Sequence, residues 1–435
     1  MVLNNVSSAP GRYGLLGRKL GHSYSPLIHG MLADYDYELH EIEPDCVERF
    51  IRGGDYAGLN VTIPYKQVAY GCCDELSPAA QKLGNVNTLH RKQDGTLYGD
   101  NTDYFGLSYL LDSAGMDVSG AKVLVLGTGG ASKTAQAVLI DKGAREVVAV
   151  SRTGKNNYQN LDLHTDTDFI VNATPVGMFP NCPASPLSLS CFIEGVGSVC
   201  EQTRARKGGL RGVVDLVYNP ERTGLMLQAE KLGIPHASGL SMLVAQAKAS
   251  CELWQGTAID NARIDEIASF IASSQRNIVL IGMPSCGKST VGKLLATALG
   301  RNFVDLDEEI VKLAGISIPE IFEQSGEAGF RDFESKVCVD FGKLSGCVIS
   351  CGGGVVERQE NYDLLHQNGA IVYIQRNLAD LVSVGRPVSM ARGIEELAKS
   401  RRPRYEAWAD VAVTNDCNPG STVRAICQSL GLLYL

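Results

Sequence analysis

Two glycine-rich segments of the chain have the composition of phosphate-binding turns. One reads Lys122-Val-Leu-Val-Leu-Gly-Thr-Gly-Gly-Ala-Ser, and the other reads Asn277-Ile-Val-Leu-Ile-Gly-Met-Pro-Ser-Cys-Gly-Lys-Ser-Thr. In each, a short apolar run leads through glycines into a helical pattern, at 134–142 and 291–299. Glycine lets the backbone approach a ligand closely, and a helix N-terminus offers free N–H groups to an anion. The turns differ in kind, so they predict two α/β units rather than an internal repeat.

The first turn, residues 127–131, fits a dinucleotide-binding site. It does not have the full G-x-G-x-x-G spacing, so an ordinary glycine turn of an α/β protein is the alternative interpretation. The next predicted strand, 146–150, ends in Ser151-Arg152-Thr153, with Lys155 nearby. A carboxylate there would bind the ribose hydroxyl of NAD, whereas a guanidinium pairs bidentately with a 2′-phosphate. An exposed basic loop is the alternative interpretation. The pattern favours NADP(H) over NAD.

The second turn, residues 282–289, matches the phosphate-binding loop G-x-x-x-x-G-K-[ST]. Lys288 would neutralise the phosphates and Ser289 would ligate Mg²⁺. A nucleotide-dependent switch is the alternative, but the chain has no N-K-x-D motif. Downstream, 303–307 reads as a strand with Asp305 and Asp307 on one face. One carboxylate could help to hold Mg²⁺ through water, and the other could accept a proton from a substrate hydroxyl.

Arginines and glycines follow in the same half, as Phe330-Arg-Asp-Phe-Glu334, Cys351-Gly-Gly-Gly354, Arg386-Pro387 and Arg401-Arg-Pro-Arg-Tyr405. Arginine suits a small carboxylate and the charge that develops on a transferring phosphoryl group. A surface i,i+3 pair and an ordinary loop are the alternatives for the first two segments.

The first hundred residues carry dense polar clusters at 22–26, 60–66, 84–88 and 101–103. Their Ser, Thr, Asn and Lys side chains suit a polyhydroxylated ligand that bears a carboxylate. A lysine and an aspartate placed together could exchange a proton with an alcohol while a hydride moves. Taken singly, Lys66 reads as a surface lysine, 101–103 as an Asx turn and His22 as a structural histidine.

As a set, residues 13–256 closely resemble shikimate dehydrogenase. Seven blocks carry the resemblance in order: Leu20-Gly-His-Ser-Tyr-Ser-Pro, Asn60-Val-Thr-Ile-Pro-Tyr-Lys, Val86-Asn-Thr, Asn101-Thr-Asp, Asn172-Ala-Thr-Pro-Val-Gly-Met, Asp215-Leu-Val-Tyr-Asn-Pro and Gly239-Leu-Ser-Met-Leu-Val-Ala-Gln. The resemblance implies that Lys66 and Asp103 form the catalytic pair. It implies that shikimate is held by Ser23, Ser25, Thr62, Asn87, Asp103 and Gln246. It assigns the NADP site to Gly127, Gly129, Gly130, Ala131, Arg152, Thr153, Thr174, Tyr218 and Gly239. Ser151 replaces the usual Asn of the N-R-T motif, and the stretch between Met178 and Val213 is longer than usual.

Residues 277–415 resemble shikimate kinase through the phosphate-binding loop, D-x-D, I-x-E-I-F, G-E-x-x-F-R-x-x-E, G-G-G, R-P and R-x-P-x-Y blocks. The resemblance assigns shikimate to Asp307, Arg331, Gly353, Gly354 and Arg401. It assigns the nucleotide to Gly282, Gly287, Lys288, Ser289 and Thr290, and Mg²⁺ to Ser289 and Asp305. Arg386 would be the lid arginine that closes on the phosphates. The lid departs from the family, because it is short, lacks an upstream arginine and has Val388-Ser389 in place of two leucines.

The bulk composition agrees with several packed cores. The chain has 435 residues, 44% of them apolar and 20% charged, which excludes a disordered or collagen-like protein and predicts about three domains. Its net charge is −8 and it has no long basic run, so we expect no nucleic-acid partner. No apolar run approaches 18 residues and no secretory signal is readable, so we expect no membrane partner. Thirteen cysteines without C-x-x-C indicate reduced thiols in a cytoplasmic protein.

These elements predict an α/β chain: a shikimate dehydrogenase-like two-domain unit with a Rossmann NADP domain, then a P-loop, NMP-kinase-like domain with a parallel sheet. We expect a discontinuous substrate domain (1–105 with 240–274), the NADP domain (106–239) and the kinase domain (277–435). The polar stretch 273–276 marks the boundary, and 178–211 predicts a long surface loop.

The expected function is NADPH-dependent reduction of 3-dehydroshikimate to shikimate, followed by ATP-dependent phosphorylation to shikimate 3-phosphate, in aromatic amino-acid biosynthesis. Two alternatives stay open. The kinase half could be a nucleotide-sensing module, or the first half could be a catabolic quinate/shikimate dehydrogenase that uses NAD.

Overall fold

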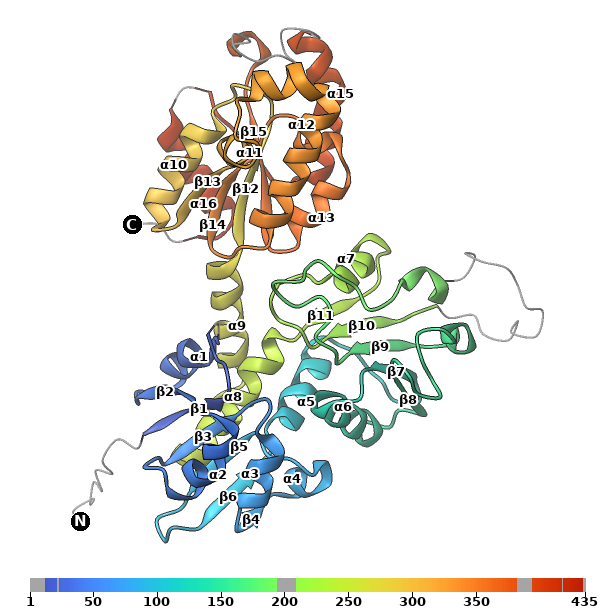
Figure 1. Ribbon diagram of the computed structural model, residues 1–435, viewed down its shortest axis with the longest axis vertical. Helices are drawn as coiled ribbons and strands as arrows, with labels where there is room; N and C mark the ends of the chain where they lie inside the picture. The colour runs from blue at the N-terminus through green and yellow to red at the C-terminus, as the bar shows by residue number, and fades with distance from the viewer. Residues whose placement is uncertain (1–11, 22, 194–208, 382–392, 417, 433–435) are drawn as a thin grey trace. The chain divides into compact units, whose positions relative to one another are not determined.

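A computed structural model describes residues 12–21, 23–193, 209–381, 393–416 and 418–432. The chain forms two compact units. The first comprises residues 1–175, 186–218 and 228–270, and the second comprises 176–185, 219–227 and 271–435. Figure 1 shows the first unit in blue through green to yellow-green and most of the second in yellow to red.

The first unit contains a six-stranded mixed sheet in the order β2-β1-β3-β5-β6-β4. Strand β5 runs antiparallel to β3 and β6, whereas β1 pairs in parallel with β2 and β3. The strands are β1 (Tyr13–Gly17), β2 (Tyr37–Glu41), β3 (Gly58–Val61), β4 (Glu75–Leu76), β5 (Thr88–Arg91) and β6 (Leu97–Asp100). The accompanying helices are α1 (Ser25–Leu32), α2 (Pro44–Gly53), α3 (Lys66–Cys72), α4 (Pro78–Leu83), α8 (Leu240–Gln255) and α9 (Ala262–Gln275).

A second sheet in this part of the chain is entirely parallel, in the order β11-β10-β9-β7-β8. Its strands are β7 (Lys122–Leu126), β8 (Glu146–Val150), β9 (Phe169–Asn172), β10 (Gly212–Asp215) and β11 (His236–Ser238). Its helices are α5 (Asp103–Ser113), α6 (Gly130–Asp141) and α7 (Gly224–Lys231). The continuous burial of β7 and β9 is typical of parallel strands that are covered on both faces. This is the doubly wound α/β arrangement expected for the dinucleotide turn.

The second unit is built on a parallel five-stranded sheet in the order β13-β14-β12-β15-β16. Its strands are β12 (Asn277–Ile281), β13 (Asn302–Asp305), β14 (Cys347–Ser350), β15 (Gly369–Gln375) and β16 (Val411–Thr414). Its helices are α10 (Lys288–Leu299), α11 (Leu306–Ala314), α12 (Ile318–Gly342), α13 (Glu360–His366), α15 (Ile394–Trp408) and α16 (Pro419–Ser429). Strand β12 is central and wholly buried, and the phosphate-binding loop leaves its carboxyl end. That position is the usual one for a ligand site in a parallel sheet.

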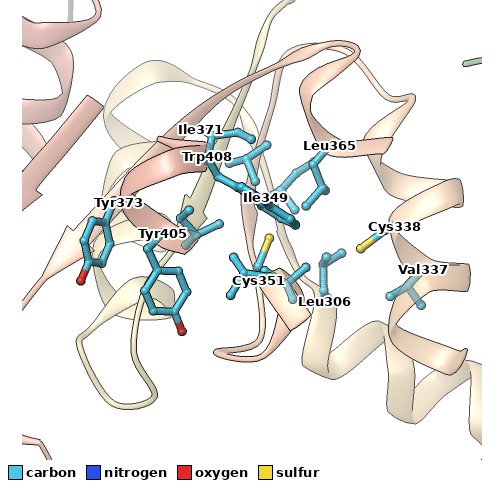
Figure 2. Packing of buried hydrophobic residues seen from close by; sticks show 14 of the residues in the cluster. Leu306, Val337, Cys338, Ile349, Cys351, Leu365, Ile371, Tyr373, Tyr405 and Trp408 are labelled. Atoms are coloured by element: carbon cyan, nitrogen blue, oxygen red, sulfur yellow. The ribbon is translucent and has the colours of Figure 1, made fainter. Parts of the chain in front are cut away.

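A hydrophobic core on one face of this sheet holds the helices that carry site residues (Figure 2). Leu306 of α11, Cys351 after β14 and Tyr405 of α15 are buried in it. The Tyr405 ring stacks on Tyr373 of β15 with centroids 5.1 Å apart. These contacts pack the start of α11, the start of the glycine loop (residues 352–354) and the C-terminal part of α15 into one core.

Two expectations about local structure need correction. Residues 303–307 do not form one strand, because β13 ends at Asp305 and Asp307 lies in the first turn of α11. The described part of the segment predicted as a surface loop also contributes to packing, since Leu189 and Phe192 in a short 3₁₀ helix are buried. Residues 194–208 of that segment lie outside the described part.

Within the described residues, all eleven cysteines are free thiols. No group of three His, Cys, Asp or Glu side chains there has the geometry to hold a metal ion. None of the helices described is both long and apolar enough to cross a membrane.

Candidate active sites

The first site is built around a lysine–aspartate pair. Lys66 begins α3 and Asp103 begins α5, and the Lys66 Nζ donates to Asp103 Oδ2 at 2.6 Å. Both side chains are largely covered, with 25% and 17% of their surfaces exposed. A partly desolvated ammonium held against a carboxylate can deliver a proton to a developing alkoxide and receive it back. The structure therefore brings together the two residues that the sequence placed 37 positions apart.

Asn87 and Gln246 join this pair. Asn87 Nδ2 donates to Asp103 Oδ1 at 2.9 Å and lies 3.5 Å from Gln246 Oε1. Gln246 reaches the site from α8, which packs against α5. Gly106 of α5 makes the close approach possible, because a Cβ there would lie 2.7 Å from the backbone oxygen of Met242.

The two serines and Thr62 lie at the carboxyl edge of the first sheet. Strands β1 and β3 are parallel neighbours, and Thr62 directly follows β3. Ser25 is the first residue of α1, is buried, and its N–H donates to Ser23 Oγ at 3.2 Å. Thr62 and Lys66 both follow β3, so they lie at the same edge of this sheet.

The first glycine turn leaves open space where a pyrophosphate would lie. Gly127 has φ 106°, and Gly129 caps the N-terminus of α6. Cβ atoms built on Gly129 or Gly130 meet nothing within 4 Å, and both glycines are exposed, as is Ala131. The residues present therefore fit an anionic group at the helix N-terminus.

The remaining dinucleotide candidates follow the ends of neighbouring strands. Arg152 and Thr153 are exposed directly after β8, beside the glycine turn that follows β7. Thr174 follows β9, and its hydroxyl donates to Asn172 Oδ1 at 2.7 Å. Tyr218 lies beyond β10. Gly239 admits no side chain, because a Cβ would lie 2.2 Å from the Leu216 oxygen.

The second site begins at the phosphate-binding loop. Gly282 has φ 146°, and a Cβ there would collide with Ile374 O. Gly287 has φ 98°, and a Cβ there would collide with Asn415 Nδ2. Lys288 is buried and folds back over the loop, where its Nζ donates to the oxygens of Gly282 and Met283 at 2.9 and 3.0 Å. The ammonium is thus held over the turn that faces a phosphate chain. Thr290 is exposed in the first turn of α10.

Ser289 and Asp305 form a hydroxyl–carboxylate pair. Ser289 Oγ donates to Asp305 Oδ2 at 2.6 Å. The other Asp305 oxygen caps α11 by accepting from the Asp307 N–H at 3.1 Å. Ser350, which the sequence did not single out, lies 3.3 Å from Ser289 Oγ at the end of β14. Oxygen ligands of this kind fit Mg²⁺, which usually keeps several waters and substrate phosphates.

The arginine–glutamate pair in α12 is buried, and so the surface interpretation is wrong. Arg331 Nη1 donates to Glu334 Oε2 at 2.6 Å, and their side chains are 8% and 1% exposed. Burial raises the pKa of Glu334 to about 7, although the Arg331 charge opposes this shift. Glu327 supports the guanidinium from the other side at 3.2 Å.

The glycine loop is buried and closes over these charged groups. A Cβ on Gly353 would lie 2.7 Å from Pro284, and one on Gly354 would lie 2.0 Å from Arg331 Nη2. Arg401 is 2% exposed, and its Nε donates to Glu357 Oε1 at 2.7 Å. Arg331 Nε and Arg401 Nη2 are buried and have no hydrogen-bond partner among the described residues. Unpaired buried donors of this kind fit an anionic, hydroxyl-bearing ligand.

Sequence reasoning missed Glu357, which accepts from Arg401 and Arg404. Burial would raise the pKa of its carboxyl, but the arginines lower it. Glu357 belongs to no recognised block, so no sequence signal marked it. Arg386, the expected lid arginine, and Val388-Ser389 lie outside the described residues.

Comparison with known families places both halves. Residues 15–89 match the shikimate dehydrogenase substrate binding domain, and residues 284–431 match shikimate kinase. A shikimate dehydrogenase (NADP(+)) of Caldicellulosiruptor bescii is 34% identical over 266 residues, which cover 55% of this chain and 88% of the relative.

Solved structures give the same result for the N-terminal part. Shikimate dehydrogenase 1 of Peptoclostridium difficile is 36% identical and has a TM-score of 0.53, with 60% of this chain and 97% of that chain covered. A shikimate 5-dehydrogenase of Thermus thermophilus, solved in complex with NADP(H) and shikimate, is 29% identical with a TM-score of 0.51. The match covers 60% of this chain and 98% of that one.

Proposed function

Because the chain belongs to the shikimate dehydrogenase family and also carries a shikimate kinase domain, we propose that it is a bifunctional enzyme of the shikimate pathway. The first half reduces 3-dehydroshikimate to shikimate with NADPH. The second half transfers the γ-phosphoryl group of ATP to the 3-hydroxyl of shikimate. The product of the first reaction is the substrate of the second.

In the dehydrogenase half, the Lys66–Asp103 pair carries the proposal. Bound NADPH supplies a hydride to the carbonyl carbon of the substrate. Lys66 donates a proton to the carbonyl oxygen, so that the ketone becomes an alcohol. Asp103, whose Oδ2 lies 2.6 Å from Lys66 Nζ, keeps the ammonium aimed at that oxygen. Asn87 and Gln246 then hold the ring hydroxyls, and Ser23, Ser25 and Thr62 hold the carboxylate end of the substrate.

Cofactor choice in this half rests on Arg152. Its exposed guanidinium follows β8, where it can pair with the 2′-phosphate of NADP. The glycine turn and Ala131 bind the pyrophosphate through backbone N–H groups at the start of α6. Thr153, Thr174, Tyr218 and Gly239 line the rest of the cofactor site.

In the kinase half, Asp307 accepts the proton of the 3-hydroxyl as its oxygen attacks the γ-phosphorus. Lys288 neutralises the charge that develops on the phosphoryl oxygens. Ser289 and Asp305 hold Mg²⁺, which when bound supplies further positive charge to the phosphates. Arg331 and Arg401 bind the carboxylate and hydroxyl groups of shikimate together with Gly353 and Gly354, and Arg386 closes on the phosphates.

Two assays on the full chain test this proposal. The first measures reduction of NADP⁺ by shikimate, and the second measures release of ADP from ATP with and without shikimate. We expect both activities, with NADP⁺ strongly preferred over NAD⁺ and shikimate over quinate. ATP turnover that does not depend on shikimate would indicate a nucleotide-sensing module instead. Preference for NAD⁺ and quinate would indicate a catabolic dehydrogenase.

The free thiols of the described residues support a reducing environment, so we also place the enzyme in the cytoplasm. Its ligands are small molecules: 3-dehydroshikimate, shikimate, NADP(H) and ATP.

A further inference from the structure

A buried cluster of hydroxyl and amide groups lies behind the Lys66–Asp103 pair, and its centre is Ser250 of α8. Ser250 Oγ lies 2.8 Å from Asn60 Nδ2, 2.7 Å from Thr88 Oγ1 and 3.2 Å from Thr102 Oγ1. Ser250 and Thr88 have no exposed surface. One hydroxyl therefore joins α8 to β3, to β5 and to the residue that precedes α5.

One end of this cluster is fixed by aromatic residues. Asn60 Oδ1 accepts from the Tyr37 hydroxyl at 2.8 Å and lies 2.9 Å from His29 Nε2. Burial lowers the pKa of His29 to about 3, so the ring is neutral. Its one N–H lies on Nε2, because Asn60 Oδ1, which faces Nε2, can only accept. His29 Nδ1 then accepts from the Tyr35 hydroxyl at 2.6 Å, and the ring stacks on Tyr37. The Asn60 amide is thus locked with its NH₂ group toward Ser250.

The other end of the cluster is Asn87, which touches the catalytic pair. Asn87 Oδ1 accepts from the Thr102 N–H at 2.7 Å, and Asn87 Nδ2 donates to Asp103 Oδ1 at 2.9 Å. Because Asp103 Oδ2 accepts from Lys66, the orientation of the Asn87 amide sets the orientation of the carboxylate.

The hydroxyl hydrogens of this cluster determine which atoms Ser250 accepts from and donates to, between the Asn60 end and the Asn87 end. Its own hydroxyl donates to the backbone oxygen of Gln246 at 3.0 Å, so its oxygen is free to accept. Thr88 has a single hydroxyl hydrogen and three oxygens in reach that could accept it: Ser250 Oγ at 2.7 Å, and Asn87 Oδ1 and Thr102 Oγ1, each at 3.1 Å. Because the contact with Ser250 is the shortest, Thr88 donates its hydrogen to Ser250 Oγ. Asn87 Oδ1 then accepts from the N–H and the hydroxyl of Thr102.

From this arrangement we propose that Ser250 is a positioning residue for the reduction, an inference that rests on the proposed dehydrogenase function. By accepting the Thr88 hydrogen, Ser250 fixes the Thr88 hydroxyl, which lies 3.1 Å from Thr102 Oγ1. The Asn87 amide then holds the Asp103 carboxylate in line with Lys66. Without the Ser250 oxygen, the Thr88 hydroxyl loses this acceptor and no longer holds Thr102, whose N–H fixes Asn87 Oδ1. The Asn87 amide is then no longer held against Asp103.

Steady-state kinetics of the full chain with Ser250→Ala test this inference. We expect kcat of the dehydrogenase to fall about tenfold, a part of the roughly 10²–10⁴-fold that a positioned proton donor contributes. The KM for NADP⁺ should stay within twofold of the wild-type value. The solvent deuterium isotope effect on kcat should rise, because proton transfer becomes slower. Partial unfolding alone would leave this isotope effect unchanged, since the molecules that remain folded would react normally.

Variants of Thr88 separate positioning from packing. Thr88→Val keeps the shape but removes the hydroxyl, and we expect it to reproduce the Ser250→Ala defect. Thr88→Ser keeps the hydroxyl and should restore near-wild-type kcat. The double variant Ser250→Ala/Thr88→Val should lose little more than either single variant, because both remove the same contact. As a control, Thr167→Ala removes another buried hydroxyl, one that donates to the His164 oxygen, and it should leave both kcat and the isotope effect unchanged.

A kcat and isotope effect of Ser250→Ala that both match the wild type would overturn the inference. So would equal losses in Thr88→Ser and Thr88→Val, or an equal loss in Thr167→Ala. An unchanged KM for NADP⁺ in each variant reports that the unit carrying these residues is folded. Failure of the proposed function itself would be seen separately, as a wild-type chain that does not reduce NADP⁺ with shikimate.

Discussion

Replacing Gly354 with alanine should displace the guanidinium that we assign to shikimate. Gly354 has φ −105°, which alanine adopts freely, so the backbone is not strained. A Cβ there would lie 2.0 Å from Arg331 Nη2 and 2.2 Å from Nη1. Normal contact needs about 3.5 Å. The guanidinium must therefore move by more than about 1 Å, although Glu334 and Glu327 hold it from two sides.

A displacement of about 1 Å in a binding or catalytic group can lower the rate about 10²-fold, or about 2.7 kcal/mol. We therefore expect kcat/KM for shikimate in the kinase reaction of Gly354→Ala to fall about 10²-fold, mainly through KM. The KM for ATP and the dehydrogenase activity of the same chain should change less than twofold. Gly420→Ala is the matched control, because among the described residues its Cβ would meet only Asn418 Oδ1, at 3.2 Å. A Gly354→Ala chain with wild-type shikimate kinetics would refute the assignment of Arg331.

Two further predictions concern charge. Arg152→Ala should raise the KM for NADP⁺ about 10–100-fold and leave the KM for NAD⁺ nearly unchanged, since only NADP⁺ carries the 2′-phosphate; equal losses with both cofactors would contradict this role. The folded-state pKa of Glu334 is raised from 4.5 to about 7, so the folded chain binds the extra proton between these values. Stability should therefore fall as pH rises from about 4.5 to 7, by roughly 3 kcal/mol. Glu334→Gln should flatten this slope in denaturant unfolding followed by Trp408 fluorescence in a Trp254→Phe background, and an unchanged slope would point to another group.

The local signals in the sequence were strongest where a turn type determines the geometry. The expected turns at 127–131 and 282–289 lie between a buried strand and a helix, because glycine and strand periodicity act over a few residues. The pairing of Lys66 with Asp103 could be expected only from the family resemblance, since their separation along the chain carries no geometric information.

The errors have physical causes. The alternation of Asp305 and Asp307 resembled a strand, but an Asp side chain also caps helices, and that role ended β13 at Asp305. Arg331 and Glu334 have the spacing of a surface pair. Their burial depends on the glycine loop, about twenty residues downstream, packing over them. Glu357 and Ser250 act through contacts between distant elements, which no local pattern reports.

The central claim is that one chain carries two independent active sites. A coupled assay from 3-dehydroshikimate with NADPH and ATP tests it most directly, in wild type and in separate Lys66→Ala and Lys288→Ala variants. Lys66→Ala should abolish NADPH oxidation and still phosphorylate added shikimate. Lys288→Ala should oxidise NADPH normally and accumulate shikimate without releasing ADP. The account would be contradicted if either variant, correctly folded, lost both activities. It would also be contradicted if both variants kept both activities.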